Sequence, residues 1–284
     1  MAKGAWSKLA ALCACTVAAA ALSSCGAVAK KEPQAQAAAT AEDGAGASAL
    51  AAVGDNACVV VSDTTITTRQ EASAGVMAAA NGCILAQNLT IETQGAYSPM
   101  LYAGTGSGTI QASGVEGRSS GAYAPCVYSR GTLMLEDSEM VAYASACAVL
   151  EGANSLSLTQ TALESQGSEM GVLVFQPDAG QVEQADSGMA ELWVSGGRVT
   201  AAQGAALYVT NTKAYICITD SAEVLGGSGV AVKAAAGQWG SSGNNGGRLV
   251  LRSDGAMEGD IEYDSLSSVE TVPAEETETN AKTP

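Results

Sequence analysis

Acidic side chains are the groups in this chain that could do acid–base chemistry, because its 284 residues include no histidine. Histidine is the commonest general base and the commonest zinc ligand, so other residues would have to take both roles. A glycosidase would need two carboxyl groups about 5–10 Å apart. The aspartates are instead spread along the chain, mostly at expected turns: Asp55, Asp63, Asp137, Asp178, Asp186, Asp220 and Asp254. This scatter favours a protein that is not an enzyme.

Tyrosines are better candidates for contact with a ligand. Three of them share one position of a repeated segment, and two more each lie two residues before a proline. Strand alternation would turn them outward, where stacked rings could pack against sugar rings. Half-buried packing is the alternative role. The candidate ligand-binding residues are Tyr97, Tyr102, Tyr123, Tyr128 and Tyr208, with Trp239 from a loop that could equally cap the end of the fold.

One cysteine has the sequence context of a lipid attachment site. Two lysines precede the uncharged stretch 9–22, as in a secretory signal, and this stretch is shorter than the roughly 20 residues of a spanning helix. Leu22-Ser23-Ser24-Cys25 resembles the bacterial lipobox, which implies cleavage before Cys25 and a diacylglyceryl group on its thiol. Two or more acyl chains give stable anchoring. We therefore expect an exported bacterial lipoprotein, held on the cell envelope through Cys25, with a plain secreted protein as the alternative.

The charge of the chain narrows the classes of partner that it could bind, and the remaining cysteines have a structural interpretation. A net charge of −16 argues against nucleic acid. The same charge suits weak binding of a divalent cation such as Ca²⁺, and no other cofactor is expected. Export permits disulfides. With no metal-ligand spacing among them, the remaining cysteines of the mature chain are interpreted as small core residues: Cys58, Cys83, Cys126, Cys147 and Cys217.

An internal repeat is the element that would position these side chains. Each unit contains three short apolar strands separated by turns with glycine or small polar residues, and most units are roughly 22–26 residues long. The units begin at Ala51, Gly75, Pro99, Pro125, Cys147, Gly171, Ala205 and Gly229. Such units leave no room for helices, and one coil cannot bury its own apolar face. The sequence therefore predicts an all-β protein, a right-handed parallel β-helix of about eight coils.

A polar residue recurs at the turn before the third strand of several units: Asp63, Asn88, Asp137, Gln160 and Asp254. Stacked there, such side chains would bond the backbones of neighbouring turns. The β-helix is expected to span residues 49–268. Before it come a signal peptide over 1–24 and a flexible tether over 25–48, and a disordered acidic tail follows over 269–284.

The repeat region resembles a known group of proteins, most specifically in residues 208–214, 233–235, 238–247 and 259–261. It is similar to bacterial cell-surface β-helix proteins that are described as adhesin-like or carbohydrate-binding and are related in fold to pectate lyases. The resemblance implies a non-catalytic binding module on the envelope, with a polysaccharide or a surface protein as partner. A pectate-lyase-like enzyme and a structural or host-protein adhesin are the alternatives. The sequence predicts no oligomeric state.

Overall fold

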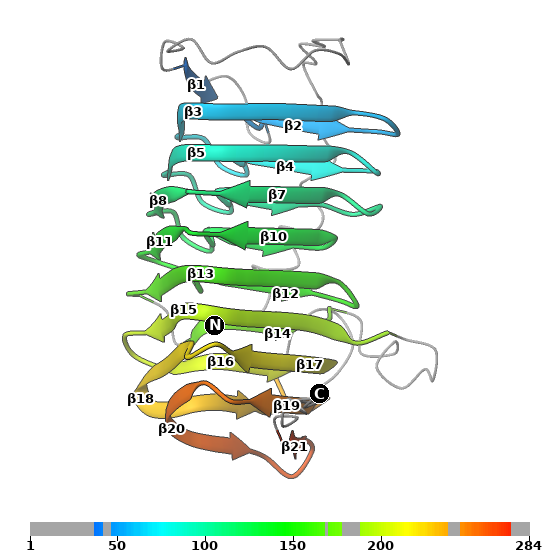
Figure 1. Ribbon diagram of the computed structural model, residues 1–284, viewed down its shortest axis with the longest axis vertical. Coiled ribbons are helices and arrows are strands. Elements are labelled where there is room, and N and C mark those ends of the chain that lie inside the picture. The colour runs from blue at the N-terminus through cyan, green and yellow to red at the C-terminus, as the bar shows by residue number, and fades with distance from the viewer. Residues whose placement is uncertain (1–36, 42–46, 168–169, 178–187, 238–244, 274–284) are drawn as a thin grey trace, which may run out of the picture.

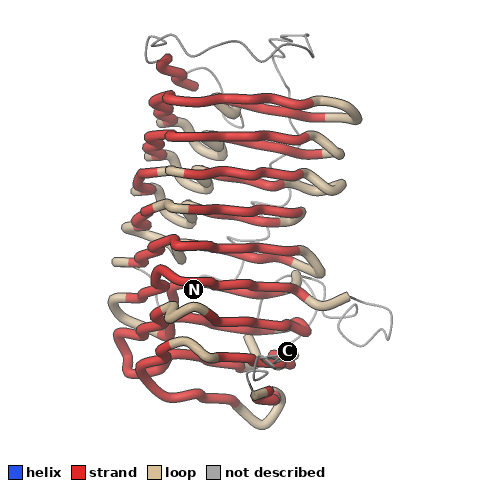
Figure 2. The backbone as a smooth tube through the Cα atoms, in the orientation of Figure 1, coloured by secondary structure: helices blue, strands red, loops and turns tan. Residues whose placement is uncertain are grey.

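The computed structural model describes residues 37–41, 47–167, 170–177, 188–237 and 245–273. These residues form strands and connecting turns without any helix, which confirms the all-β prediction (Figure 2). Within these described ranges there is accordingly no helix long and apolar enough to cross a membrane. The signal peptide, Cys25 and Trp239 lie outside the described residues.

The strands stack in rungs that follow one another in chain order, from blue at the top of Figure 1 to red at the bottom. Three columns of parallel strands run through the stack, and the longest strands bend from one column into another. The first column contains β2 (Leu50–Val53), β4 (Val76–Ala79), β6 (Leu101–Ala103), β9 (Val127–Ser129), β12 (Ala148–Glu151), β14 (Met170–Phe175), β16 (Ala205–Thr210) and the second parts of β18 (Glu223–Ala234) and β20 (Ala256–Tyr263).

The second and third columns share several of these long strands. The second contains the first parts of β3 (Cys58–Thr68), β5 (Cys83–Thr93), β13 (Ser155–Ser165) and β15 (Ala190–Ala201), together with β7 (Thr109–Ser113), β10 (Thr132–Glu136), β17 (Thr212–Thr219), β19 (Gly247–Ser253) and β21 (Ser268–Val272). The third contains β1 (Ala37–Ala41), β8 (Glu116–Ser119), β11 (Glu139–Ala142), the second parts of β3, β5, β13 and β15, and the first parts of β18 and β20.

Alternate residues of each column point into one continuous apolar core. In β10, for example, Leu133 is fully buried and lies between Ile110 and Leu156 of the neighbouring rungs. Among the described residues, the hydrophobic side chains of this core are Ala, Val, Leu, Ile, Met and Cys, without an aromatic ring. Rungs spaced by about 4.8 Å put like residues in contact, so small and branched aliphatic side chains fill it.

A one-residue corner separates the second column from the third. Asp63, Asn88, Asp137 and Gln160 adopt φ angles of 50°, 54°, 47° and 47° there, a region that asparagine and aspartate tolerate better than most residues. Asn88 Nδ2 donates to Asp63 Oδ1 at 3.0 Å across 25 residues of sequence. The predicted recurrence of polar residues at this corner is therefore confirmed at these four positions, and a side-chain bond between rungs joins Asp63 and Asn88, whereas Asp254 does not have a positive φ.

The unit starts and the boundaries of the repeat region differ in part from the prediction. The register places Ala51 opposite Met77 and not opposite Gly75, and it shifts several later unit starts by one residue relative to their predicted partners. The apolar run 49–53 contains no polar residue that marks a strand start, so strand pairing decides its position. Strands also lie beyond both predicted boundaries of the repeat region, since β1 pairs with β3 and β21 pairs with β19. Each adds a partner to a strand that would otherwise have a free edge.

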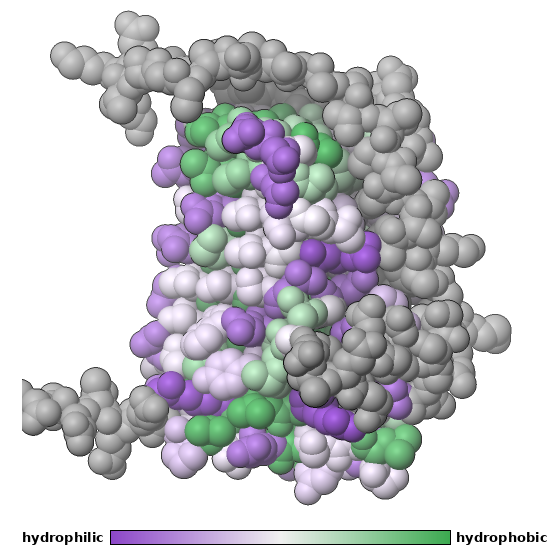
Figure 3. Space-filling view, turned by 90° about the vertical axis from the view of Figure 1, so that its right-hand side faces the viewer, coloured by the Kyte–Doolittle hydropathy of each residue, from purple (hydrophilic) through white to green (hydrophobic). Residues whose placement is uncertain are grey.

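Figure 3 shows the side of the stack where turns connect the first column to the second. Hydrophobic residues gather at the top and at the lower end of this side, and the middle is paler or hydrophilic. The exposed apolar side chains near the start of the stack are Val53, Val60 and Leu85.

Candidate functional site

The first column presents an outward row of side chains in addition to its inward row. Tyr102 lies opposite Tyr128, and Tyr208 lies between Leu173 and Lys233 in the same row. The row consists of Ala51, Met77, Tyr102, Tyr128, Val149, Leu173, Tyr208, Lys233 and Glu262. With Tyr97 and Tyr123 beside it, we call this surface the tyrosine face. Its apolar members form a cluster separate from the inner core, as strand alternation predicts.

The tyrosines of the first rungs form two parallel stacks. The ring centroids of Tyr97 and Tyr123 are 5.5 Å apart with 11° between their planes. Those of Tyr102 and Tyr128 are also 5.5 Å apart, with an angle of 13°. These separations are typical of favourable aromatic pairs. Four of the predicted ligand-binding residues are thus brought together over two neighbouring rungs.

The two stacks differ in exposure. Tyr102 and Tyr128 are only 2% and 0% exposed, because they pack with Met77, Val149 and Leu173 on the outer side of the column. The expectation that they are exposed is wrong, and packing, the alternative role, describes them. Tyr97, Tyr123 and Tyr208 are half-buried at the margin of the same cluster. These three rings are therefore the accessible aromatic part of the tyrosine face, in addition to exposed Lys233 and Glu262.

The stack of Tyr97 and Tyr123, which we call the outer stack, has an unusual backbone conformation. Tyr97 and Tyr123 have φ angles of 56° and 55°, and Ala72 has 56° in the preceding turn. Bulky residues rarely adopt this region, and such strain is typical of functional sites. The turns leave no space between them, since a Cβ on Gly121 would lie 1.9 Å from the Gly95 carbonyl oxygen. Burial, and then the neighbouring Tyr123, raises the pKa of Tyr97.

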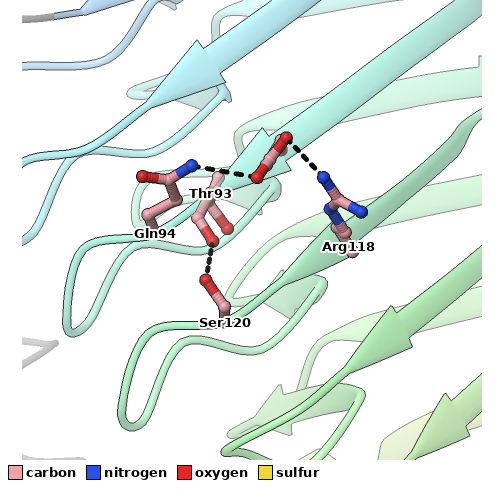
Figure 4. Close-up of polar contacts among 5 residues, drawn as sticks. Thr93, Gln94, Arg118 and Ser120 are labelled. Carbon is pink, nitrogen blue, oxygen red and sulfur yellow. Dashed lines mark hydrogen bonds and ion pairs between the residues drawn. The ribbon is translucent and has the colours of Figure 1, made fainter.

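Polar contacts join the strand ends that lead into these two turns (Figure 4). Gln94 Nε2 donates to Glu92 Oε1 at 2.9 Å, and Arg118 reaches the other carboxylate oxygen of Glu92 at 3.1 Å. The hydroxyl of Ser120 donates to the carbonyl oxygen of Thr93 at 3.5 Å. The bonds from Gln94 and Arg118 lower the pKa of Glu92. The contacts of Arg118 and Ser120 link the ends of strands in two neighbouring rungs.

A charged network lies beside the stack of Tyr102 and Tyr128, which we call the inner stack. The hydroxyl of Tyr128 donates to Glu151 Oε2, and Arg130 Nε lies 3.0 Å from Glu151 Oε1. Burial raises the pKa of Glu151, and the positive charge of Arg130 opposes this shift. Burial, and then the negative charge of Glu151, raises the pKa of Tyr128 well above its usual value. Glu151 is 3% exposed, so the network orients the Tyr128 ring and does not face solvent.

Arg130 and Glu151 are not among the residues predicted from the sequence. The signal was present, because Arg130 follows Tyr128 by two positions and Glu151 follows Val149 by two, which keeps both on the outward side of their strands. When two successive apolar strands each end at a charged residue, and the two charges are opposite, an ion pair between neighbouring rungs is expected. Several aspartates, by contrast, occupy the corners between the second and third columns.

The lower end of the tyrosine face opens into a shallow hollow of about 380 Å³. Tyr208 and Met170 give it apolar walls, and Lys233 and Glu262 add charges that lie 3.8 Å apart. A second hollow of about 440 Å³ shares Lys233 and Glu262 and continues towards Tyr263 and Asp264. An aromatic wall beside a hydrogen-bonding ion pair suits a ring that carries hydroxyl groups.

Another aromatic pair lies on the outward side of the second column. The rings of Trp193 and Tyr215 are 5.4 Å apart and tilted by 57°. Trp193 is 41% exposed, while its strand neighbours Leu192 and Val194 are buried. The alternating burial of β15 is the signal that could have found it.

The acidic residues do not form a catalytic or metal-binding cluster among the described residues. Asp63, Asp137 and Asp220 are all corner residues with positive φ, and Asp220 accepts a hydrogen bond from Ser195. Throughout the part of the chain that the structure describes, no three His, Cys, Asp or Glu side chains come close enough to hold a metal ion. Asp178 and Asp186 lie outside this part.

Comparison with protein families, with curated proteins and with solved structures gives no match to this chain.

Proposed function

We propose that this chain is a lipid-anchored envelope protein whose parallel strands form a right-handed β-helix of about eight coils, and that it is a non-catalytic module binding a polysaccharide. The β-helix hypothesis is supported by hydrogen bonds between residues that are 26, 25 and 23 positions apart, which is about the expected length of one coil. About 98% of connections between parallel strands of one sheet are right-handed. The anchor hypothesis is supported by the lipobox-like residues that end at Cys25.

The observation that carries the binding hypothesis is the tyrosine face. Tyr97 and Tyr123 stack with half-buried rings in strained turns, and Tyr208 lines a hollow in the same outward row. Rings along a rod-like surface suit a polymer of repeating units, because each unit can contact one ring. The hollow adds Lys233 and Glu262 as hydrogen-bonding partners for hydroxyl groups. These half-buried rings pack at the margin of the cluster that contains buried Tyr102 and Tyr128.

A pull-down of the full chain in detergent on insoluble neutral and acidic polysaccharides, with and without Ca²⁺, tests this function. The supernatant is assayed for released sugars and unsaturated products. We expect retention without products, and a loss of retention in the Tyr97→Ala/Tyr123→Ala double variant and in Tyr208→Ala. Tyr143→Ala is the matched control, since Tyr143 is 45% exposed and lies outside the tyrosine face.

Each other result contradicts the proposal in a distinct way. Product release would show a carbohydrate-active enzyme. Failure to bind any of the polysaccharides would overturn the proposal in favour of a protein-binding or structural adhesin. The anchor is tested separately by detergent phase partitioning. A Cys25→Ala variant should leave the detergent phase, and one that stays there would contradict lipid attachment at Cys25.

A further inference from the structure

Two cysteines lie side by side on the surface of the first rungs. Cys58 begins β3 and Cys83 begins β5, and they are directly opposite each other in the parallel register. Cys58 is exposed and Cys83 is half-buried. The expectation that all the cysteines of the fold are core residues is wrong for these two, because both take outward positions in their strands.

The positions of the two cysteines suit a covalent bridge. Opposed residues on neighbouring strands are about 4.8 Å apart, and the Cα atoms of a disulfide are usually about 4.4–6.8 Å apart. The two thiols are close enough to influence each other. Burial, and then the neighbouring Cys58, raises the pKa of Cys83. Exposed Cys58 is therefore the sulfur that an oxidant would reach first.

A second pair of neighbouring cysteines provides an internal contrast. Cys126 and Cys147 are also in contact, but both are fully buried in the inner core. Burial, and then the hydrogen bond with Cys147, raises the pKa of Cys126 well above its usual value. Since the thiolate is the reactive form and an oxidant cannot enter the core, this pair should stay reduced.

The edge of the stack gives the surface pair a structural role. In the described residues, β1 covers only Thr64–Thr68 of β3, so Cys58 and the residues after it have a strand partner on one side alone. Terminal units of a stacked fold are the first to open unless they are capped. A link between β3 and β5 would hold this free edge closed.

We propose that Cys58 and Cys83 form an intramolecular disulfide that staples the first two rungs after export, with the disulfide of an exported thiol–disulfide oxidoreductase as oxidant. The Cys58 thiolate attacks the oxidant and releases one of its sulfurs as a thiolate. The Cys83 thiolate then attacks the Cys58 sulfur and releases the second. The two cysteines lose two electrons and two protons, and the oxidant gains them as two thiols. The proposal rests on the export proposed above.

The test compares two samples of the full chain. One is isolated from the envelope without reductant, and the other is purified reduced and then treated with oxidised glutathione. Free thiols are alkylated before peptide mapping in both. We expect the peptides containing Cys58 and Cys83 to be linked in both samples, with a mass lower by two hydrogen atoms, while Cys126 and Cys147 are alkylated only after unfolding.

The outcomes separate the bridge from the export. A bridge with glutathione but free thiols in the envelope sample would contradict export and overturn the proposal as stated. Free thiols, stable mixed disulfides or linked dimers in both samples would overturn the bridge itself. A Cys83→Ser variant should leave Cys58 as a mixed disulfide with glutathione. Reductant should lower the Tm of the native chain and leave that of the variant unchanged.

Discussion

The inner core and the tyrosine face use alternate residues of the same strands but opposite chemistry. In β6 and β9, Leu101 and Val127 point into the core, and the next residues, Tyr102 and Tyr128, point outward. The hydrophobic cluster of the described core contains no aromatic ring, whereas the face adds aromatic rings and an ion pair. Because the stack is closed by the inward row, the outward row can carry specific chemistry without changing the fold.

The largest difference between the two regions should appear on truncation of a leucine. Leu133→Ala leaves a cavity that is closed on all sides, and we expect a loss of about 4 kcal/mol in the free energy of unfolding. Leu173→Ala, in the cluster of the tyrosine face, should cost about 2 kcal/mol because half-buried neighbours at its margin can move into the space. Urea unfolding measures both. Equal losses would show that the face is packed as tightly as the core.

The ion pair of the face should make stability depend on pH in a way that the core cannot. Burial raises the pKa of folded Glu151, so the folded chain binds this proton more tightly than the unfolded chain. Stability from this group is fully present below the unfolded pKa of about 4.3 and is lost as pH rises through the folded pKa. Each unit of pKa difference corresponds to about 1.4 kcal/mol.

Glu151→Gln removes this titration and tests its direction. The stability of the native chain relative to the variant should fall between about pH 4 and neutrality, as measured by urea unfolding at several pH values. Glu116→Gln, at an exposed position, is the control for the loss of one negative charge. A native advantage that grows with pH would mean that attraction to Arg130 outweighs burial.

A smaller effect is expected at the margin of the face. Tyr97→Ala removes one stacked ring, which is worth about 1 kcal/mol. The backbone should keep its turn, because Ala72 already adopts the same φ in the preceding rung. Urea unfolding measures the loss of stability, and Tyr143→Ala again serves as the control. A loss as large as that of Leu133→Ala would place Tyr97 in the structural core rather than on a binding surface.

The sequence was sufficient to predict the features that repeat. The parallel strands, the row containing Tyr102, Tyr128 and Tyr208, and the corner ladder at Asp63 and Asn88 all follow from residues that recur at one position of each rung. Residues that recur at one position of the repeat are expected to share a column, because every rung has the same alternation of inward and outward side chains.

What could not be predicted depends on neighbours that differ from rung to rung. Tyr102 lies between Met77 on one side and Tyr128 on the other, and the partner of Arg130 is a glutamate one rung away. The free edge of β3 at Cys58 likewise depends on where the pairing with β1 stops. These features come from contacts between rungs, which a residue's place within its own repeat does not determine.

The smallest effect is expected at the exposed ion pair beside the tyrosine-bearing turns. Hydrogen bonds from Gln94 and Arg118 lower the pKa of Glu92, so its contribution to stability is present above the unfolded pKa and is lost as pH falls through the folded pKa. Arg118→Ala should therefore cause at most a slight fall in Tm at neutral pH, and this difference should shrink further in acid and in high salt. Thermal unfolding monitored by circular dichroism at two pH values measures it. A salt-independent loss comparable to that of Tyr97→Ala would mean that Arg118 positions the turn itself, and the outer tyrosine stack would then depend on this contact between the rungs.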